Sequence, residues 1–235
     1  MSRLHHLAAW LGGAAFVASL LYFLYFYFVR LSTTVPQGGW GRPLAIDVAL
    51  FGGFALHHSI MPRRRVKAWF ASVAPAALER TAYVWTASIL LAVVCLAWQD
   101  VPGMAYHVTG PWAWVLRGIQ LAGVALTIRA SARLDVLDLA GIRQVQASPR
   151  HPRQPMPLQL SGPYTLVRHP IYLGWVAMVC AAPDMNANRL AFATISTLYL
   201  VIATPIEEGS LEQAFGDSYR EYRRKVRWRI VPGIY

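Results

Sequence analysis

The stretch of sequence that decides the fold is LAAWLGGAAFVASLLYFLYFYFV, residues 7–29, which contains no Asp, Glu, Lys, Arg or His. A helix needs about 20 consecutive apolar residues to cross the roughly 30 Å hydrocarbon core of a bilayer. The run is too long for the apolar region of a signal peptide and lacks a small-residue cleavage site, so we interpret it as a membrane span. The sequence therefore predicts an integral membrane protein.

Five further apolar stretches follow along the chain, at 44–61, 81–98, 112–130, 171–182 and 190–205. The fifth span is short, so the last two stretches are expected to form a helical hairpin. The predicted fold is all-α: a polytopic transmembrane helix bundle of five to six spans. We expect a single membrane domain over 1–235, with a four-span N-terminal bundle at 1–130 and a C-terminal region at 131–235 that carries the chemistry.

Composition and charge support this interpretation. The chain is 56% hydrophobic and only 14% charged, yet its formal net charge is +11. On so apolar a background, a basic excess favours anionic lipid headgroups over nucleic acid as the partner. The connectors at 99–111 and 183–188 contain no Lys or Arg, whereas the other long connectors and the tail are basic. Because basic loops stay in the cytoplasm, both termini are expected there, in a prokaryote at the inner membrane. The cluster at 63–67, followed by Trp69 and Val73, predicts an amphipathic helix on the inner leaflet.

Polar residues inside the predicted spans are expensive and need partners. We expect Arg117 to pair with Asp47. His57 and His58 are adjacent, so on a helix they point about 100° apart and cannot both ligate one metal from the same face. Interfacial hydrogen bonding, a place in an acceptor pocket, and ligation of haem or metal remain open for them. No metal site is predicted.

The segment GPYTLVRHPIYLG, residues 162–174, carries a candidate anion site. Pro170 suits the first turn of a helix, where its missing N–H is of no consequence. Arg168 and His169 then stand at the helix N-terminus, where exposed N–H groups and the dipole favour a carboxylate or phosphate. Gly174 allows a ligand or another helix to approach closely.

A second cluster begins with Glu207 and Glu208, at the expected end of the sixth apolar helix. Two adjacent carboxylates there are costly without partners, and a ligand with a positive charge or with hydroxyl donors supplies them. Apolar and aromatic residues follow at helical spacing, which predicts one aromatic stripe on one helix. The stripe consists of Leu211, Phe215, Tyr219 and Tyr222.

Taken in this order, the two clusters resemble the signature of the isoprenylcysteine carboxyl methyltransferase and phospholipid methyltransferase superfamily, over residues 162–232. The segments 56–70, 79–84 and 137–145 are similar to the bacterial branch that contains methanethiol S-methyltransferases. The resemblance implies S-adenosylmethionine as methyl donor, held in a cytoplasmic cofactor cleft of the C-terminal region. It implies Arg168 and Glu208 as catalytic residues. The implied cofactor-binding residues are Tyr164, Leu166, Val167, Arg168, His169, Pro170, Tyr172, Gly174, Glu207 and Glu208.

The resemblance leaves the methyl acceptor open. Relatives commonly carry an Arg shortly before the paired acids, where this chain has Thr204-Pro205-Ile206, which weakens the case for a carboxylate acceptor. We expect a small lipophilic or membrane-borne acceptor, either a thiol or an isoprenylcysteine carboxylate, and a lipid amine also remains open. The residues expected to contact it are His57, His58, Arg143 and Gln144. Two other classes remain open: a sterol-reductase-like NADPH oxidoreductase, and a non-enzymatic haem or transport protein.

Overall fold

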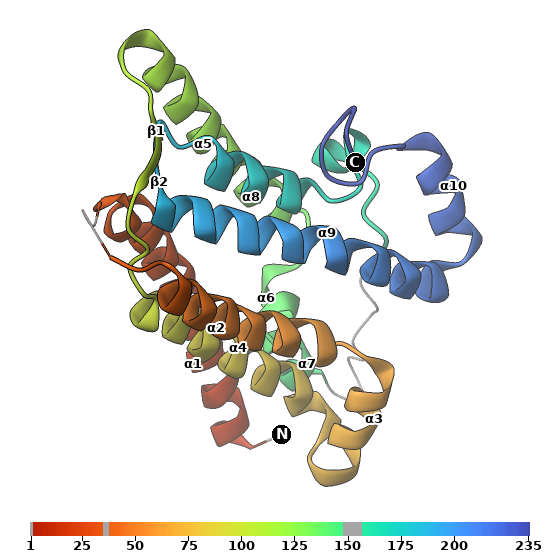
Figure 1. The fold of residues 1–235 in the computed structure, drawn as a ribbon. Coiled ribbons are helices and arrows are strands. Elements are labelled where there is room, and N and C mark those ends of the chain that lie inside the picture. The colour runs from red at the N-terminus through yellow and green to blue at the C-terminus, as the bar shows by residue number, and fades with distance from the viewer. Residues whose placement is uncertain (1, 35–37, 148–156) are drawn as a thin grey trace. The chain divides into compact units, whose positions relative to one another are not determined.

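The computed structural model describes residues 2–34, 38–147 and 157–235, most of which are helical (Figure 1). The α-helices are α1 (Arg3–Phe28), α2 (Gly41–Ile60), α3 (Arg64–Val73), α4 (Glu79–Ala97), α5 (Gly110–Ser131), α6 (Val136–Leu139), α7 (Ile142–Gln146), α8 (Pro170–Cys180), α9 (Ala187–Phe215) and α10 (Asp217–Lys225). The shorter elements are the 3₁₀ turns η1 (Arg30–Ser32), η2 (Ala76–Leu78) and η3 (Gly162–Thr165), and the antiparallel strands β1 (Met104–His107) and β2 (Asp184–Asn186). The predicted all-α polytopic fold is confirmed.

Four helical stretches among the described residues are long and apolar enough to cross a membrane. They are Arg3–Ser32, Gly41–Ile60, Ala76–Ala97 and Ala187–Phe215. They match the first, second, third and sixth predicted spans, and the chain is an integral membrane protein. The fourth predicted span is the helix α5, and the fifth is α8. With 11 residues at about 1.5 Å each, α8 is about 16 Å long and too short to cross alone. It packs against α9, as expected for a hairpin.

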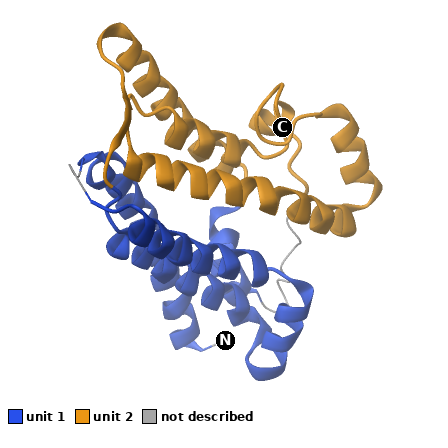
Figure 2. Ribbon diagram, in the orientation of Figure 1, with its two compact units in different colours: residues 1–101, 135–155 blue, residues 102–134, 156–235 orange. Residues whose placement is uncertain are grey.

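Residues 1–101 and 135–155 form the first of two compact units (Figure 2). In this unit α4 packs against α1 and α2, and α7 packs against α1. Gly12 permits the close approach of α1 to α4, because a Cβ there would lie 3.0 Å from the indole nitrogen of Trp85. The predicted amphipathic helix is present as α3, with Trp69 and Val73 exposed. Its placement on the inner leaflet stays a prediction.

Residues 102–134 and 156–235 form the second unit, in which the main packing is between α5 and α8. These helices cross at two glycines. A Cβ on Gly123 would lie 2.5 Å from the carbonyl oxygen of Gly174, and a Cβ on Gly174 would lie 2.5 Å from the carbonyl oxygen of Gly123. Both distances are shorter than any real Cβ contact, so two backbones touch where side chains would keep them apart. The predicted fourth span therefore belongs to the same compact unit as the C-terminal region.

The expected pairing of Arg117 with Asp47 is wrong. Arg117 donates to Asp184 Oδ2 (2.9 Å), and His107 Nδ1 lies 2.6 Å from the other oxygen of that carboxylate. These contacts tie α5 to the two-stranded ribbon of the second unit. Asp47 lies in the first unit and accepts a hydrogen bond from the backbone N–H of Gln99 (2.8 Å). The partner of a polar side chain is set by which groups the packing brings close to it. For Asp47 that partner is the backbone amide of Gln99.

Candidate functional site

A cavity of about 220 Å³ lies within the second unit, beside the start of α8. The segment before α8 forms one wall, the second half of α9 another, and α10 the third. The lining includes the polar side chains of Arg168, His169, Tyr172 and Glu207. It also includes the aromatic side chains of Tyr164, Phe215, Tyr219 and Tyr222. The cavity is thus suited to a ligand that has both charged groups and a flat, less polar group.

The start of α8 is fixed by the C-terminal tail. Pro170 is the first helical residue, as predicted. The backbone N–H of Arg168 donates to the carbonyl of Trp228 (2.9 Å), and that of His169 donates to the carbonyl of Arg229 (2.8 Å). The extended chain before α8 and the tail therefore pair by their backbones. Through this pairing the tail holds Arg168 and His169, two residues of the cavity lining, in place.

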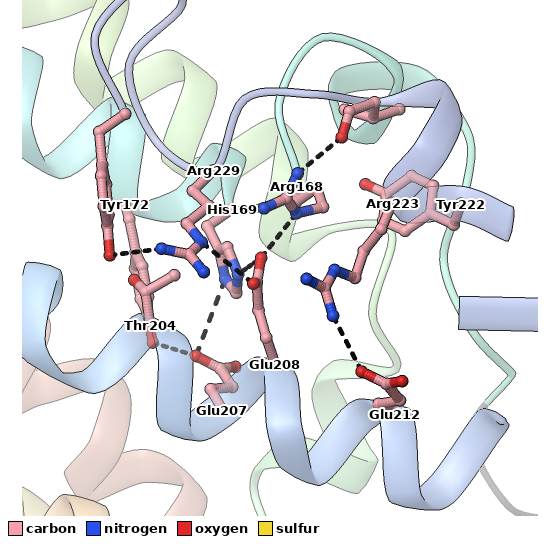
Figure 3. Close-up of polar contacts among 12 residues, drawn as sticks. Arg168, His169, Tyr172, Thr204, Glu207, Glu208, Glu212, Tyr222, Arg223 and Arg229 are labelled. Carbon is pink, nitrogen blue, oxygen red and sulfur yellow. Dashed lines mark hydrogen bonds and ion pairs between the residues drawn. The ribbon is translucent and has the colours of Figure 1, made fainter. Parts of the chain in front are cut away.

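Behind the cavity wall lies a buried ion cluster centred on Glu208 (Figure 3). Arg168 Nε donates to Glu208 Oε1 (2.6 Å), and Arg229 Nε donates to Glu208 Oε2 (3.1 Å). The side chains of Arg168 and Glu208 are only 6% and 3% exposed. Arg168 Nη1 also donates to the carbonyls of Val226 (2.7 Å) and Arg227 (2.6 Å). Removing one partner from such a buried pair leaves a charge without compensation, at a cost of about 3–5 kcal/mol.

Glu207, adjacent to Glu208, faces the cavity instead. Its side chain is 45% exposed and accepts a hydrogen bond from the hydroxyl of Tyr172 (2.6 Å). His169 Nδ1 lies 3.8 Å from the same carboxylate. Consecutive helical residues point about 100° apart. Glu208 therefore contacts the two arginines, whereas Glu207 faces the cavity. The two acids thus have different positions and different partners.

The paired acids lie inside α9, and the expected helix end before them is wrong. The helix continues past Pro205 to Phe215. Proline cannot donate to the carbonyl four residues earlier, which leaves the carbonyl of Val201 without its helical donor. The hydroxyl of Tyr235 supplies that donor (3.2 Å), and the same hydroxyl accepts a hydrogen bond from Arg229 (3.0 Å). The proline therefore creates an attachment point for the tail.

The aromatic stripe expected on one helix lies on two helices. Gly216 adopts a left-handed backbone angle, with φ of 54°, and separates α9 from α10. The bend brings Tyr219 and Tyr222 of α10 to the cavity, with ring centroids 6.0 Å apart. The hydroxyl of Tyr222 donates to the carbonyl of Tyr164 (2.7 Å). Burial, together with the nearby carboxylate of Glu207, raises the pKa of Tyr164 to about 12.

The structure brings six of the predicted cofactor-binding residues to the cavity: Tyr164, Arg168, His169, Pro170, Tyr172 and Glu207. The other four lie outside its lining. Leu166 is exposed to the surroundings, Val167 is fully buried, Gly174 packs against α5, and Glu208 lies in the ion cluster. Sequence reasoning missed the role of Arg229, which it counted only as part of a basic tail. The spacing of the tail gave no signal for its contact with Glu208.

The residues predicted to contact an acceptor lie in the first unit. His58 Nδ1 is 2.8 Å from the hydroxyl of Tyr83, and the ring of His57 stacks on the ring of Tyr83. Arg143 donates to Asp135 (2.9 Å), and Gln144 donates to the carbonyl of Asp138 (3.1 Å). Hydrogen bonds within the unit thus engage three of the four side chains, and a stacking contact engages the fourth. Their role toward an acceptor stays a prediction.

The fold and the cavity define a polytopic helical membrane protein with a cavity in its second unit. No family model matches the chain, and no solved structure matches it. Methanethiol S-methyltransferase 2 of Bradyrhizobium diazoefficiens is 33% identical, over 94% of this chain and 87% of the relative. The methanethiol S-methyltransferase of Mycobacterium tuberculosis is 35% identical, over 79% of this chain and 77% of the relative. Nurim of Pan troglodytes is 29% identical, over 72% and 68%. The chain belongs to this family of membrane methyltransferases, within which Nurim is a more distant relative.

Proposed function

We propose that the protein is an S-adenosylmethionine-dependent methyltransferase that methylates the sulfur of a small alkanethiol. The observation that carries this proposal is the cavity, which places a cation, an anion and an aromatic wall around one ligand space. The donor has matching groups: an α-carboxylate, an α-ammonium and a nucleoside. The acceptor class comes from the relatives, whose names specify methanethiol.

The charged side chains of the lining fit the amino-acid part of the donor. Three N–H groups of Arg168 are used by Glu208 and by tail carbonyls. The two on Nη2 have no partner among the described residues, which leaves them for a carboxylate. Glu207 is the carboxylate that lines the cavity, and it suits the ammonium group. Tyr172 donates to Glu207 and orients it.

When bound, the donor supplies an electrophilic methyl group, whose bond to the sulfonium sulfur breaks as a bond to the acceptor sulfur forms. Such a transfer depends mainly on positioning and on exclusion of water. In this chain the buried cluster of Arg168, Glu208 and Arg229 keeps the cavity walls rigid. The thiol loses its proton to water before it reacts, because the thiolate is the nucleophile. The rate is therefore expected to rise with pH toward the pKa of the thiol.

The proposal includes a membrane orientation. The basic connectors and the basic tail favour the cytoplasmic side for both termini and for the cavity. A donor made in the cytoplasm then reaches the cavity directly, while an apolar acceptor arrives from the bilayer. A cysteine-accessibility assay on intact cells, with single cysteines placed in the tail and in the loop at 99–111, checks this orientation.

The test of function begins with calorimetric binding of S-adenosylhomocysteine to detergent-purified protein. We expect saturable binding, weakened by Glu207→Gln and by His169→Ala. A methyl-labelled donor is then offered with methanethiol or with farnesylcysteine, and labelled dimethyl sulfide is measured in the headspace. Label transferred only to farnesylcysteine would replace the thiol with a carboxylate acceptor. Folded protein that binds neither donor nor product refutes the proposal as a whole.

A further inference from the structure

One of the aromatic residues that line the cavity carries a polar group that forms no hydrogen bond within the described part of the chain. Tyr219 lines the cavity and is only 1% exposed, and its hydroxyl has no hydrogen-bond partner among the described residues. A buried hydroxyl without a partner destabilises the fold, and buried polar groups in proteins are otherwise nearly always paired. The nearby hydroxyl of Tyr222 follows the rule, because it donates to the carbonyl of Tyr164.

The surroundings of this hydroxyl are those of a site for a flat heterocycle. Tyr164, Phe215 and Tyr222 also line the cavity, and bases stack favourably on aromatic side chains. Burial, together with the nearby carboxylate of Glu208, raises the pKa of Tyr219, so its hydroxyl stays neutral and is able both to donate and to accept. Glu207, the carboxylate that fits an amino group, lines the same cavity.

We propose that the aromatic side chains of the lining bind the nucleoside of the donor, and that the hydroxyl of Tyr219 forms a hydrogen bond to this nucleoside. Tyr219 is then a binding residue that sets affinity and orientation, in addition to the polar residues of the cavity. This inference rests on the proposed function, since it assigns part of the same site. It also means that the bend at Gly216 brings a residue that binds the ligand to the cavity.

The experiment uses two ligands that differ only at the amino-acid end. S-adenosylhomocysteine has both ends, whereas 5′-methylthioadenosine has the nucleoside without the amino acid. Tyr219→Phe removes one hydroxyl and is expected to raise the Kd of both ligands about 5-fold, the equivalent of one hydrogen bond. Its thermal stability should stay equal to that of the wild type or increase, because the unpaired hydroxyl is gone. Glu207→Gln should weaken S-adenosylhomocysteine alone.

Tyr106→Phe is the control, because Tyr106 belongs to the same unit, is not among the cavity-lining residues, and its hydroxyl donates to the carbonyl of Cys180. This variant should keep a nearly normal Kd for both ligands. Equal losses of affinity in the two Tyr→Phe variants would point to packing and overturn the proposal. Three other results for Tyr219→Phe would also overturn it. They are an unchanged Kd, a loss of affinity confined to S-adenosylhomocysteine, and a higher KM for the thiol with no change in the Kd of either ligand. If the wild-type protein binds neither ligand, the proposed function itself fails, which is a different result from these.

Discussion

Replacing Glu208 with Ala should destabilise the protein strongly, because it removes the carboxylate at the centre of the buried ion cluster. Two guanidinium groups, from Arg168 and Arg229, would then face each other without their counter-charge. The Arg168–Glu208 pair is almost completely buried, so its disruption should cost about 3–5 kcal/mol. The contact with Arg229 is weaker in effect, since that side chain is 29% exposed.

The loss of stability in Glu208→Ala can be expressed as a decrease in melting temperature. For a chain of this size, each kcal/mol lowers the Tm by about 2–4 °C, so Glu208→Ala should lower it by about 6–20 °C. Tryptophan fluorescence during heating in detergent, without added ligand, measures the shift. Arg229→Met should produce a smaller loss of stability, about 1.5–2 kcal/mol, the lower part of the range for hydrogen bonds to charged groups.

A double variant separates the ion pair from simple loss of packing. Replacing a whole buried pair with apolar residues is often neutral, whereas removing one partner is not. Arg168→Met with Glu208→Leu should therefore be more stable than either single variant. A double variant that melts below both single variants would refute the reasoning. So would a Glu208→Ala protein whose Tm falls by less than about 2 °C, because the smallest expected loss corresponds to about 6 °C.

Three further predictions concern packing, pH and the tail. Gly123→Ala should lower stability by about 1–3 kcal/mol, whereas Gly118→Ala, whose new Cβ meets nothing within 4 Å, should not; equal melting temperatures would contradict the close crossing of α5 and α8. Stability should fall as pH rises above about 10, the pKa of an unfolded tyrosine, because the pKa of Tyr164 is raised to about 12 in the fold; denaturant titrations from pH 8 to 11 measure this, and a flat profile would contradict it. Tyr235→Phe should cost about 1 kcal/mol in the wild type and less in a Pro205→Ala background, where a restored N–H satisfies Val201; an equal cost in both would exclude the link.

The membrane class follows from the sequence by itself, and so does the grouping of most of the candidate site residues. The thickness of the bilayer fixes how long an apolar helix must be, so runs such as 7–29 are readable without a structure. The order of Arg168, His169 and the paired glutamates pointed to the family and to residues that lie around one cavity. These features depend on composition and on spacing along one helix, which are local properties of the chain.

The tertiary structure decided which of these residues have which partner. Helical geometry predicts that Glu207 and Glu208 diverge, but only the packing of α8, α9 and the tail turns Glu207 to the cavity and Glu208 to the arginines. The same holds for Arg117, which contacts Asp184 and not Asp47. It holds for Arg229, which reaches Glu208 across 21 positions of sequence. Charge partners are chosen by proximity in the folded chain, and a sequence read element by element contains no measure of that proximity.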